Sequence, residues 1–254
     1  MSTCIFNSKS NTDEQSSSIT VGANSVSPQN CTYPNAQSSS LPKSRAYIFD
    51  LDGTLLDSMD VWERIDIEFL EKRNIAIPPD YIPTVLSMTF PESAAYTIHR
   101  FCLTDSVEEL LQEWNRMAIH AYANTVPLKP YAKEYLTSLR ERGAKLAIAT
   151  SLPAQLYEPA LHAHGIYGMF DAISSTDEVS RGKTYPDVFL LTAQKLGEEP
   201  ANCIVFEDIL AAIKSAKSIG MTVYGVYDKS SEADWAEIEK TADGVICNFK
   251  NLYI

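Results

Sequence analysis

The stretch that decides the fold is Ala46-Tyr47-Ile48-Phe49-Asp50-Leu51-Asp52-Gly53-Thr54. It opens with a short apolar run of the kind found in a buried strand, and the run stops at an aspartate. Two later segments repeat this design, because residues 145–149 end at Thr150-Ser151 and residues 203–206 end at Glu207-Asp208. Continuous apolar strands indicate a sheet that is covered on both faces. The sequence therefore predicts a parallel sheet.

Helical patterns separate the predicted strands. Residues 130–142 carry apolar side chains on one stripe, between Pro130 and Gly143. Three similar segments follow, each ending next to a glycine: 152–164, 186–196 and 209–219. Further strands are expected at 222–226 and 244–247. Strands that alternate with helices in this way indicate a doubly wound, Rossmann-like α/β fold.

Residues 58–126 interrupt the alternation, because they show helical patterns and no strand signal. Val61, Ile65 and Phe69 lie on one apolar stripe, and Ser106-x-x-Glu109 is a capping box that opens a second helix. An insertion directly after the first strand would lie over the crevice where open α/β sheets bind ligands. We therefore predict a helical cap domain at 58–126 and a core domain formed by 45–57 and 127–254.

Residues 1–44 differ from the rest of the chain. Eleven of the first 40 residues are Ser, and no apolar periodicity is present. Such a segment cannot bury enough apolar surface to offset the entropy lost on ordering. We predict a disordered Ser/Asn-rich tail at 1–44.

Composition narrows the functional classes. The 254-residue chain carries a net charge of −12, which argues against nucleic acid or an anionic membrane as a partner. It has no apolar run of about 18 residues, the length that spans a bilayer. Its first ten residues lack the apolar centre of a secretory signal, and its five cysteines include no Cys-x-x-Cys pair. We expect a cytoplasmic monomer that acts on a small molecule.

Carboxyl and hydroxyl side chains follow the predicted strands. The carboxyl ends of parallel strands meet at one crevice, so these residues should be neighbours: Asp50, Asp52, Thr150, Ser151, Glu207 and Asp208. Crowded carboxylates repel one another unless a cation holds them, and ligands that are all oxygen suit a hard ion such as Mg²⁺. Lys183, in a loop between strands, is placed to supply a fixed positive charge.

The segment Phe49 to Ser58 resembles the first motif of the haloacid dehalogenase-like phosphohydrolase superfamily. Ala149-Thr150-Ser151 resembles the second motif, Lys183 the third, and Phe206-Glu207-Asp208 the acidic fourth. The order and spacing agree over residues 45–254. Among the members with a helical cap, the chain resembles the β-phosphoglucomutase-like phosphatases. It departs from the family pattern at Tyr131, where relatives often have Gly.

The resemblance implies a role for each residue. Asp50 would be the nucleophile that forms an aspartyl-phosphate, and Asp52 would protonate the leaving group and then activate water. Gly53 would turn the backbone sharply beside the phosphate. The phosphoryl oxygens would be bound by Thr54, Thr150, Ser151 and Lys183. Mg²⁺ would be bound by Asp50, the backbone carbonyl of Asp52 and Asp208, with Glu207 as a direct or outer partner.

Other interpretations of single motifs fail. In an EF-hand the glycine stands at the sixth position of the loop, but Gly53 is the fourth residue from Asp50. A P-loop that ends at Gly182-Lys183-Thr184 would need a glycine where the chain has Asp177.

Several reactions are compatible with the motifs. Asp52 argues against a dehalogenase or a phosphonatase, because those relatives lack an acid two residues after the nucleophile. Sugar phosphomutases of the β-phosphoglucomutase type share all four motifs, but they carry basic residues in a cap loop, and residues 87–92 contain none. We therefore predict a Mg²⁺-dependent phosphatase for a small phosphomonoester, such as a sugar phosphate. The alternatives are a sugar phosphomutase and a non-catalytic protein that binds phosphorylated metabolites.

Overall fold

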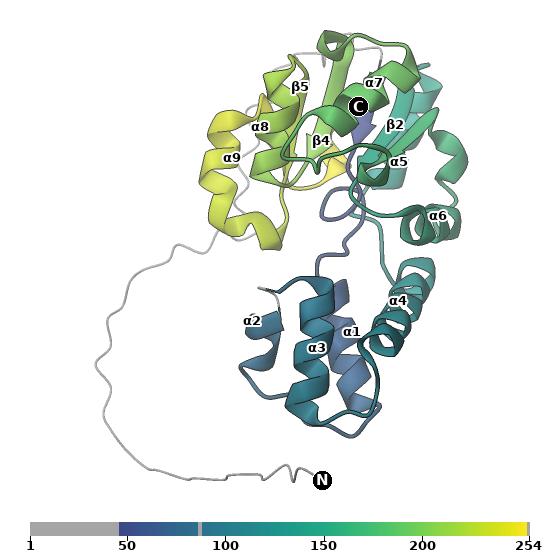
Figure 1. Ribbon diagram of the computed structural model, residues 1–254. Coiled ribbons are helices and arrows are strands. Elements are labelled where there is room, and N and C mark those ends of the chain that lie inside the picture. The colour runs from purple at the N-terminus through teal and green to yellow at the C-terminus, as the bar shows by residue number, and fades with distance from the viewer. Residues whose placement is uncertain (1–45, 86–87, 253–254) are drawn as a thin grey trace.

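The computed structural model describes residues 46–85 and 88–252, and the predicted tail at 1–44 lies outside these residues (Figure 1). Six strands form one parallel sheet in the order β3-β2-β1-β4-β5-β6. They are β1 (Ala46–Phe49), β2 (Lys145–Thr150), β3 (Ala172–Ser175), β4 (Cys203–Glu207), β5 (Thr222–Val226) and β6 (Gly244–Ile246). The predicted doubly wound α/β fold is confirmed.

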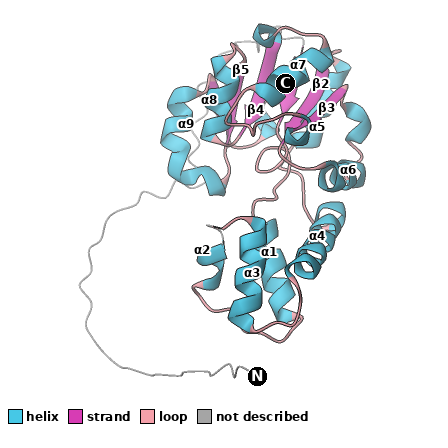
Figure 2. Cartoon of the chain, in the orientation of Figure 1, coloured by secondary structure: helices cyan, strands magenta, loops and turns pink. Residues whose placement is uncertain are grey.

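Helices cover both faces of the sheet (Figure 2). They are α5 (Ala132–Glu141), α6 (Ala154–Ala163), α7 (Asp187–Leu196), α8 (Leu210–Ser218) and α9 (Trp235–Thr241). Successive side chains of β1 point to opposite faces of the sheet. Phe49 belongs to the same apolar cluster as Tyr135 of α5. Ile48 belongs to the opposite cluster, with Phe189 of α7 and Ile213 of α8. Both faces are therefore buried, which explains the unbroken apolar runs.

Two elements of this core lack a strong sequence signal. The edge strand β3 reads Ala-Ile-Ser-Ser and pairs with β2, and α9 is a short helix of 7 residues. Neither was predicted, because β3 has no extended apolar run and α9 has little room for periodicity. Short 3-10 helices complete the connections: Tyr167–Met169, Thr176–Glu178, Pro200–Asn202, Lys229–Asp234 and Phe249–Asn251.

Among the described residues, four helices lie between β1 and β2 (Figure 1). They are α1 (Val61–Glu71), α2 (Tyr81–Val85), α3 (Phe90–Phe101) and α4 (Val107–Asn124), and we call them the inserted helices. No strand occurs among the described residues between Ser58 and Val126. Helix α4 packs against α1 and α3 and also against α6 of the sheet layer. Among the residues that the structure describes, no helix has the length and apolarity of a membrane span.

The two connections between the sheet and the inserted helices lie side by side. Leu56 and Leu128 form an antiparallel bridge. The amide of Asp57 donates to the carbonyl of Pro127 at 3.0 Å, and the amide of Lys129 donates to the carbonyl of Leu55 at 2.8 Å. The inserted helices are thus held at a pair of hydrogen-bonded segments. The division into core and cap domains at residues 57/58 and 126/127 stays a prediction.

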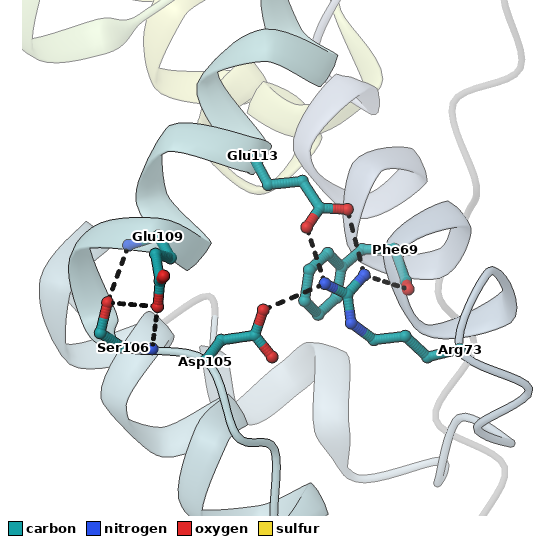
Figure 3. A network of polar contacts seen from close by, with 6 residues as sticks. All are labelled: Phe69, Arg73, Asp105, Ser106, Glu109 and Glu113. Carbon is teal, nitrogen blue, oxygen red and sulfur yellow. Dashed lines mark hydrogen bonds and ion pairs between the residues drawn. The ribbon is translucent and has the colours of Figure 1, made fainter.

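A network around Arg73 joins the end of α1 to the start of α4 (Figure 3). Its guanidinium donates to the Glu113 carboxylate at 3.0 Å and 2.7 Å, and it also reaches Asp105 at 3.4 Å. The guanidinium carbon lies 3.7 Å from the centre of the Phe69 ring. The Arg73 and Glu113 side chains are only 24% and 27% exposed, so water screens this two-point contact incompletely.

We expect Arg73 and Glu113 to be energetically coupled by about 1 kcal/mol. The measurement is a double-mutant cycle of Arg73→Met and Glu113→Gln followed by urea unfolding. The matched control is the pair Arg64 and Asp60, whose side chains are 43% and 61% exposed. Its coupling should be no more than about 0.5 kcal/mol. Equal coupling energies in the two pairs would show that the partly buried contact of Arg73 with Glu113 stabilises the protein no more than an exposed ion pair.

Tyr131 takes up a backbone conformation that favours glycine. Its φ angle is +65° at the start of α5, and its side chain is exposed. An L-residue in this left-handed region carries a strain of roughly 1–2 kcal/mol. Glycine adopts this conformation without that strain.

Replacement of Tyr131 by Gly should therefore give a more stable protein than replacement by Ala, by about 1 kcal/mol. Both variants lose the ring, and only Gly removes the strain. The same pair of substitutions at Glu134, an exposed helical residue of α5, should show the reverse order. Urea unfolding of the four variants measures both differences, and equal stability of Tyr131→Ala and Tyr131→Gly would rule out backbone strain.

Candidate active site

The predicted site residues of β1 and β4 meet at the carboxyl edge of the sheet. Asp50 follows β1, and its amide donates to the carbonyl of Phe206 in β4 at 3.0 Å. Glu207 ends β4 and Asp208 follows it. One carboxylate oxygen from each of Asp50, Glu207 and Asp208 lies within 4.8 Å of the other two, and all three residues are buried. We call these residues the carboxylate cluster.

Lys183 completes the cluster from the loop before α7. Its ammonium contacts Asp50 Oδ1 and donates to Glu207 Oε2 at 2.7 Å. Burial alone would lower the pKa of Lys183, but the charges of Asp50 and Glu207 outweigh that effect and raise the pKa above its usual value. The two carboxylates therefore favour the positively charged form of this lysine, and its role beside a phosphate stays a prediction.

The charges of the site do not balance within the protein. If every group is ionised, three carboxylates face one ammonium and two negative charges are left without compensation. Burial, followed by repulsion from Asp50, raises the pKa of Glu207 to about 7. Burial, followed by repulsion from Glu207 and Asp50, raises the pKa of Asp208 well above its usual value. A divalent cation would balance this charge, and the oxygen donors suit Mg²⁺.

The hydrogen bonds indicate which oxygens are available to a cation. Glu207 uses one oxygen for Lys183 and the other for the amide of Ile209 at 3.3 Å. Asp208 accepts only two long hydrogen bonds from the described residues, from Thr54 at 3.3 Å and Ser231 at 3.4 Å. Asp50 and Asp208 are therefore the side chains best placed to hold a metal ion, with Glu207 held mainly by Lys183.

Gly53 is required by two separate features of the turn after β1. Its φ angle is +75°, in the region that favours glycine. A Cβ atom at this position would lie 2.3 Å from Asp208 Oδ2. Any side chain here would displace the Asp208 carboxylate, so the glycine shapes the cluster as well as the turn.

Asp52 lies beside the carboxylate cluster and is held separately. Its Oδ1 accepts hydrogen bonds from Ser58 Oγ at 2.5 Å and from Tyr122 OH at 2.8 Å. Burial raises the pKa of Asp52 to about 6, although both hydrogen bonds act in the opposite direction. Its carboxylate is not among the three that form the cluster. The predicted metal contact of Asp52 is through its backbone carbonyl and needs no side-chain oxygen.

Thr150 ends the neighbouring strand β2, and Ser151 follows it. Thr150 is buried and its Oγ1 accepts the amide of Leu152 at 3.0 Å, whereas Ser151 is exposed. Helix α6 begins at Ala154 after Pro153, two residues later than predicted, so Thr150 stabilises the turn before the helix and does not cap it. The phosphate-binding roles of Thr54, Thr150 and Ser151 stay predictions.

Sequence reasoning missed several residues that surround the site. Tyr122 continues the buried stripe of α4 and reads as an ordinary core residue. Lys129 donates to Asp228 Oδ2 at 2.5 Å, and Ser231 reaches Asp208 from the loop after β5. These loop and helix residues carry no motif signal, because only the tertiary fold brings them to the sheet edge.

The fold and the site define an α/β enzyme with buried carboxylates and a lysine at the edge of a parallel sheet. Residues 44–220 match the hydrolase family described as haloacid dehalogenase-like hydrolase. The chain belongs to this family. The predicted superfamily is confirmed, and so is the prediction of a phosphoric monoester hydrolase.

Two curated relatives illustrate the likeness. The chain is 27% identical to hexitol phosphatase B of Escherichia coli over 178 residues, which are 69% of this chain and 80% of that protein. It is 30% identical to validoxylamine A 7'-phosphate phosphatase of Streptomyces hygroscopicus over 189 residues, which are 70% of this chain and 84% of the relative.

Solved structures share the fold. CbbY from Rhodobacter sphaeroides in complex with phosphate matches with a TM-score of 0.64 and 20% identity, over 82% of this chain and 96% of that one. A β-phosphoglucomutase from Clostridium difficile matches with a TM-score of 0.59 and 23% identity, over 82% of this chain and 93% of that one. At these identities the likeness concerns the fold alone.

From the carboxylate cluster we predict an effect of Mg²⁺ on stability, which can be measured without enzyme turnover. Mg²⁺ at a hundred times its Kd should stabilise the protein by about 2.7 kcal/mol, which raises the Tm by roughly 5–10 °C. Asp208→Asn should abolish this rise, because it removes a charged oxygen ligand. Differential scanning fluorimetry with and without Mg²⁺ measures the shift.

The control is Glu239→Gln, which removes an exposed carboxylate on α9 and should keep the full rise. An Asp208→Asn protein that responds to Mg²⁺ as strongly as the control would place the cation elsewhere.

Proposed function

We propose that the protein is a Mg²⁺-dependent phosphatase that hydrolyses a small phosphomonoester, such as a sugar phosphate, through an aspartyl-phosphate on Asp50. The observation that carries the proposal is the buried cluster of Asp50, Glu207 and Asp208 around the Lys183 ammonium. The names of two relatives support the substrate class: hexitol phosphatase B of E. coli and the phosphorylated carbohydrates phosphatase of Thermotoga maritima.

In the first half of the reaction a carboxylate oxygen of Asp50 attacks phosphorus. The bond between phosphorus and the leaving oxygen breaks, and the proton of Asp52 passes to that oxygen. The raised pKa of Asp52, about 6, suits a group that must carry a proton and then give it up. The Lys183 ammonium beside Asp50 stabilises the negative charge of the phosphoryl oxygens in the transition state.

In the second half water attacks the phosphorus of the aspartyl-phosphate. The deprotonated Asp52 accepts a proton from the water, and the bond between phosphorus and the Asp50 oxygen breaks. Inorganic phosphate leaves, Asp50 is a carboxylate again, and Asp52 is again protonated. The same carboxyl group therefore donates a proton in one half and accepts one in the other.

The residues present fit a bound Mg²⁺. Asp50, Asp208 and the backbone carbonyl of Asp52 would hold it, and Glu207 would act through Lys183. When bound, the ion supplies the positive charge that balances the carboxylate cluster and attracts a dianionic phosphate.

A mutase would need a second phosphate-binding site. In the sugar phosphomutases that the chain resembles, basic residues of a cap loop bind that phosphate. Here the corresponding segment includes the start of α3, where the Glu92 carboxylate accepts the amide of Thr89 at 2.8 Å in a capping box. The acidic Glu92 at a place where the mutases have a base favours hydrolysis over transfer of the phosphoryl group back to the sugar.

Asp50→Asn tests the proposed nucleophile. Phosphate release from p-nitrophenyl phosphate in the presence of Mg²⁺ should fall by roughly 10³-fold or more, because the amide oxygen is a poor nucleophile. EDTA should abolish release by the unmodified protein, and added Mg²⁺ should restore it. Asp60→Asn is the matched control, since this exposed carboxylate pairs with Arg64 at the helix surface and should leave the rate unchanged.

Persistent turnover by Asp50→Asn, or turnover in EDTA, would refute the proposed mechanism. Hexose phosphates followed by ³¹P NMR separate the alternatives, because a phosphatase accumulates inorganic phosphate and a mutase accumulates an isomeric ester. The absence of turnover on a panel of phosphomonoesters would favour the phosphate-binding alternative.

A further inference from the structure

We infer that Tyr122 is a positioning residue for Asp52, which makes α4 part of the catalytic apparatus. This inference rests on the proposed function, because it concerns the group that transfers the proton. Tyr122 lies near the end of α4, 70 positions along the chain from Asp52, and its hydroxyl donates to Asp52 Oδ1 at 2.8 Å.

Two hydroxyl groups donate to the same oxygen of Asp52. Ser58 lies in the connection after β1, and Tyr122 comes from the inserted helices. Among the described residues Oδ2 has no hydrogen-bond partner. The two donated hydrogen bonds occupy Oδ1, so Oδ2 is the oxygen left open to carry and transfer a proton. The two donors therefore distinguish the oxygens of Asp52 and leave the reactive one open.

The position of Tyr122 is set by helix packing and not by the sheet. Leu110, Trp114, Ala118 and Tyr122 form the buried stripe of α4, spaced four residues apart. The Trp114 ring packs edge-on against Phe69 of α1, with 5.7 Å between ring centres. The Tyr122 side chain is almost wholly buried. Helix α4 packs against α1, α3 and α6. The position of the Tyr122 hydroxyl at Asp52 therefore depends on how the inserted helices are placed.

Ser58 alone cannot give the same restraint. One hydrogen bond leaves the carboxyl group free to turn about the donor, whereas two donors from different directions fix its plane. A misplacement of about 1 Å can slow a reaction in a bound complex by roughly a hundredfold, so the orientation of the acid matters for proton transfer. The structure thus assigns to Tyr122 a role in orienting the Asp52 carboxyl group. Ser58 is the second donor to the same oxygen.

Tyr122→Phe is the test, since it removes only the hydroxyl. For an alkyl phosphate that the unmodified enzyme hydrolyses, such as a hexitol or hexose phosphate, kcat/KM should fall about tenfold, as expected for one lost hydrogen bond to the acid. For p-nitrophenyl phosphate, kcat/KM should stay within about twofold, because p-nitrophenolate leaves without a proton. A purely structural tyrosine would change both values by the same factor.

Rapid mixing gives a second readout in the same variant. Slower water attack should make the aspartyl-phosphate accumulate, so p-nitrophenol should appear in a burst of about one equivalent per enzyme before the steady state. In an Asp52→Asn background, Tyr122→Phe should cause no further loss with the alkyl ester.

Tyr135→Phe is the matched control. Its hydroxyl is buried and has no hydrogen-bond partner among the described residues, so both kcat/KM values should stay unchanged. If Tyr122→Phe does not fold, Tyr122→Met fills the space without a hydroxyl and the same two esters are compared.

The outcomes separate the two proposals. An active parent enzyme in which Tyr122→Phe lowers both kcat/KM values equally, or neither, overturns the role of Tyr122 and leaves the phosphatase intact. A parent enzyme that releases no phosphate in an Asp50-dependent manner overturns both.

Discussion

The contact on which the rest of the site depends is the Lys183 ammonium between Asp50 and Glu207. Asp50 follows β1 and Glu207 ends the adjacent strand β4. The apolar residues just before them, Phe49 and Phe206, are register partners with stacked rings 4.9 Å apart. The sheet therefore forces two carboxylates together in a buried place. Such a pair costs several kcal/mol in desolvation unless a positive charge is held against it. Lys183 supplies this positive charge from the loop before α7, outside the strands of the sheet.

This constraint explains the small residues around the site. One ammonium offsets only one of the three carboxylates, so Asp208 must face either a cation or a neutral donor. Gly53 leaves room for its carboxylate, and Thr54 and Ser231 offer hydroxyl groups at distances near the limit of a hydrogen bond. Weak donors of this kind stabilise the acid without competing strongly with a metal ion. The turn after β1 and the loop after β5 thus both provide hydroxyl donors to the Asp208 carboxylate.

The sequence allowed the centre of the site to be predicted because its signals are local. Unbroken apolar runs that end in acids mark β1 and β4, and parallel topology brings those ends together. The edge strand β3 ends in Ser174-Ser175 and gives no such signal. The start of α3 was not identified within the helical stretch predicted at 58–126, although Thr89 and Glu92 form a capping box there. Tyr122 could not be identified at all, since its four-residue spacing from Ala118 is that of any core residue.

The proposed chemistry explains why the inserted helices reach into the sheet edge. Asp52 has to give a proton and then take one, so its orientation matters in both halves of the reaction. Its two donors belong to different parts of the chain, one beside β1 and one on α4. The connections between these parts are joined at Leu56 and Leu128 and pinned by Lys129, which pairs with Asp57 at 3.4 Å and with Asp228. Only a placement of α4 that satisfies these contacts brings the Tyr122 hydroxyl to Asp52, and so the acid is correctly oriented only when the helices are in place.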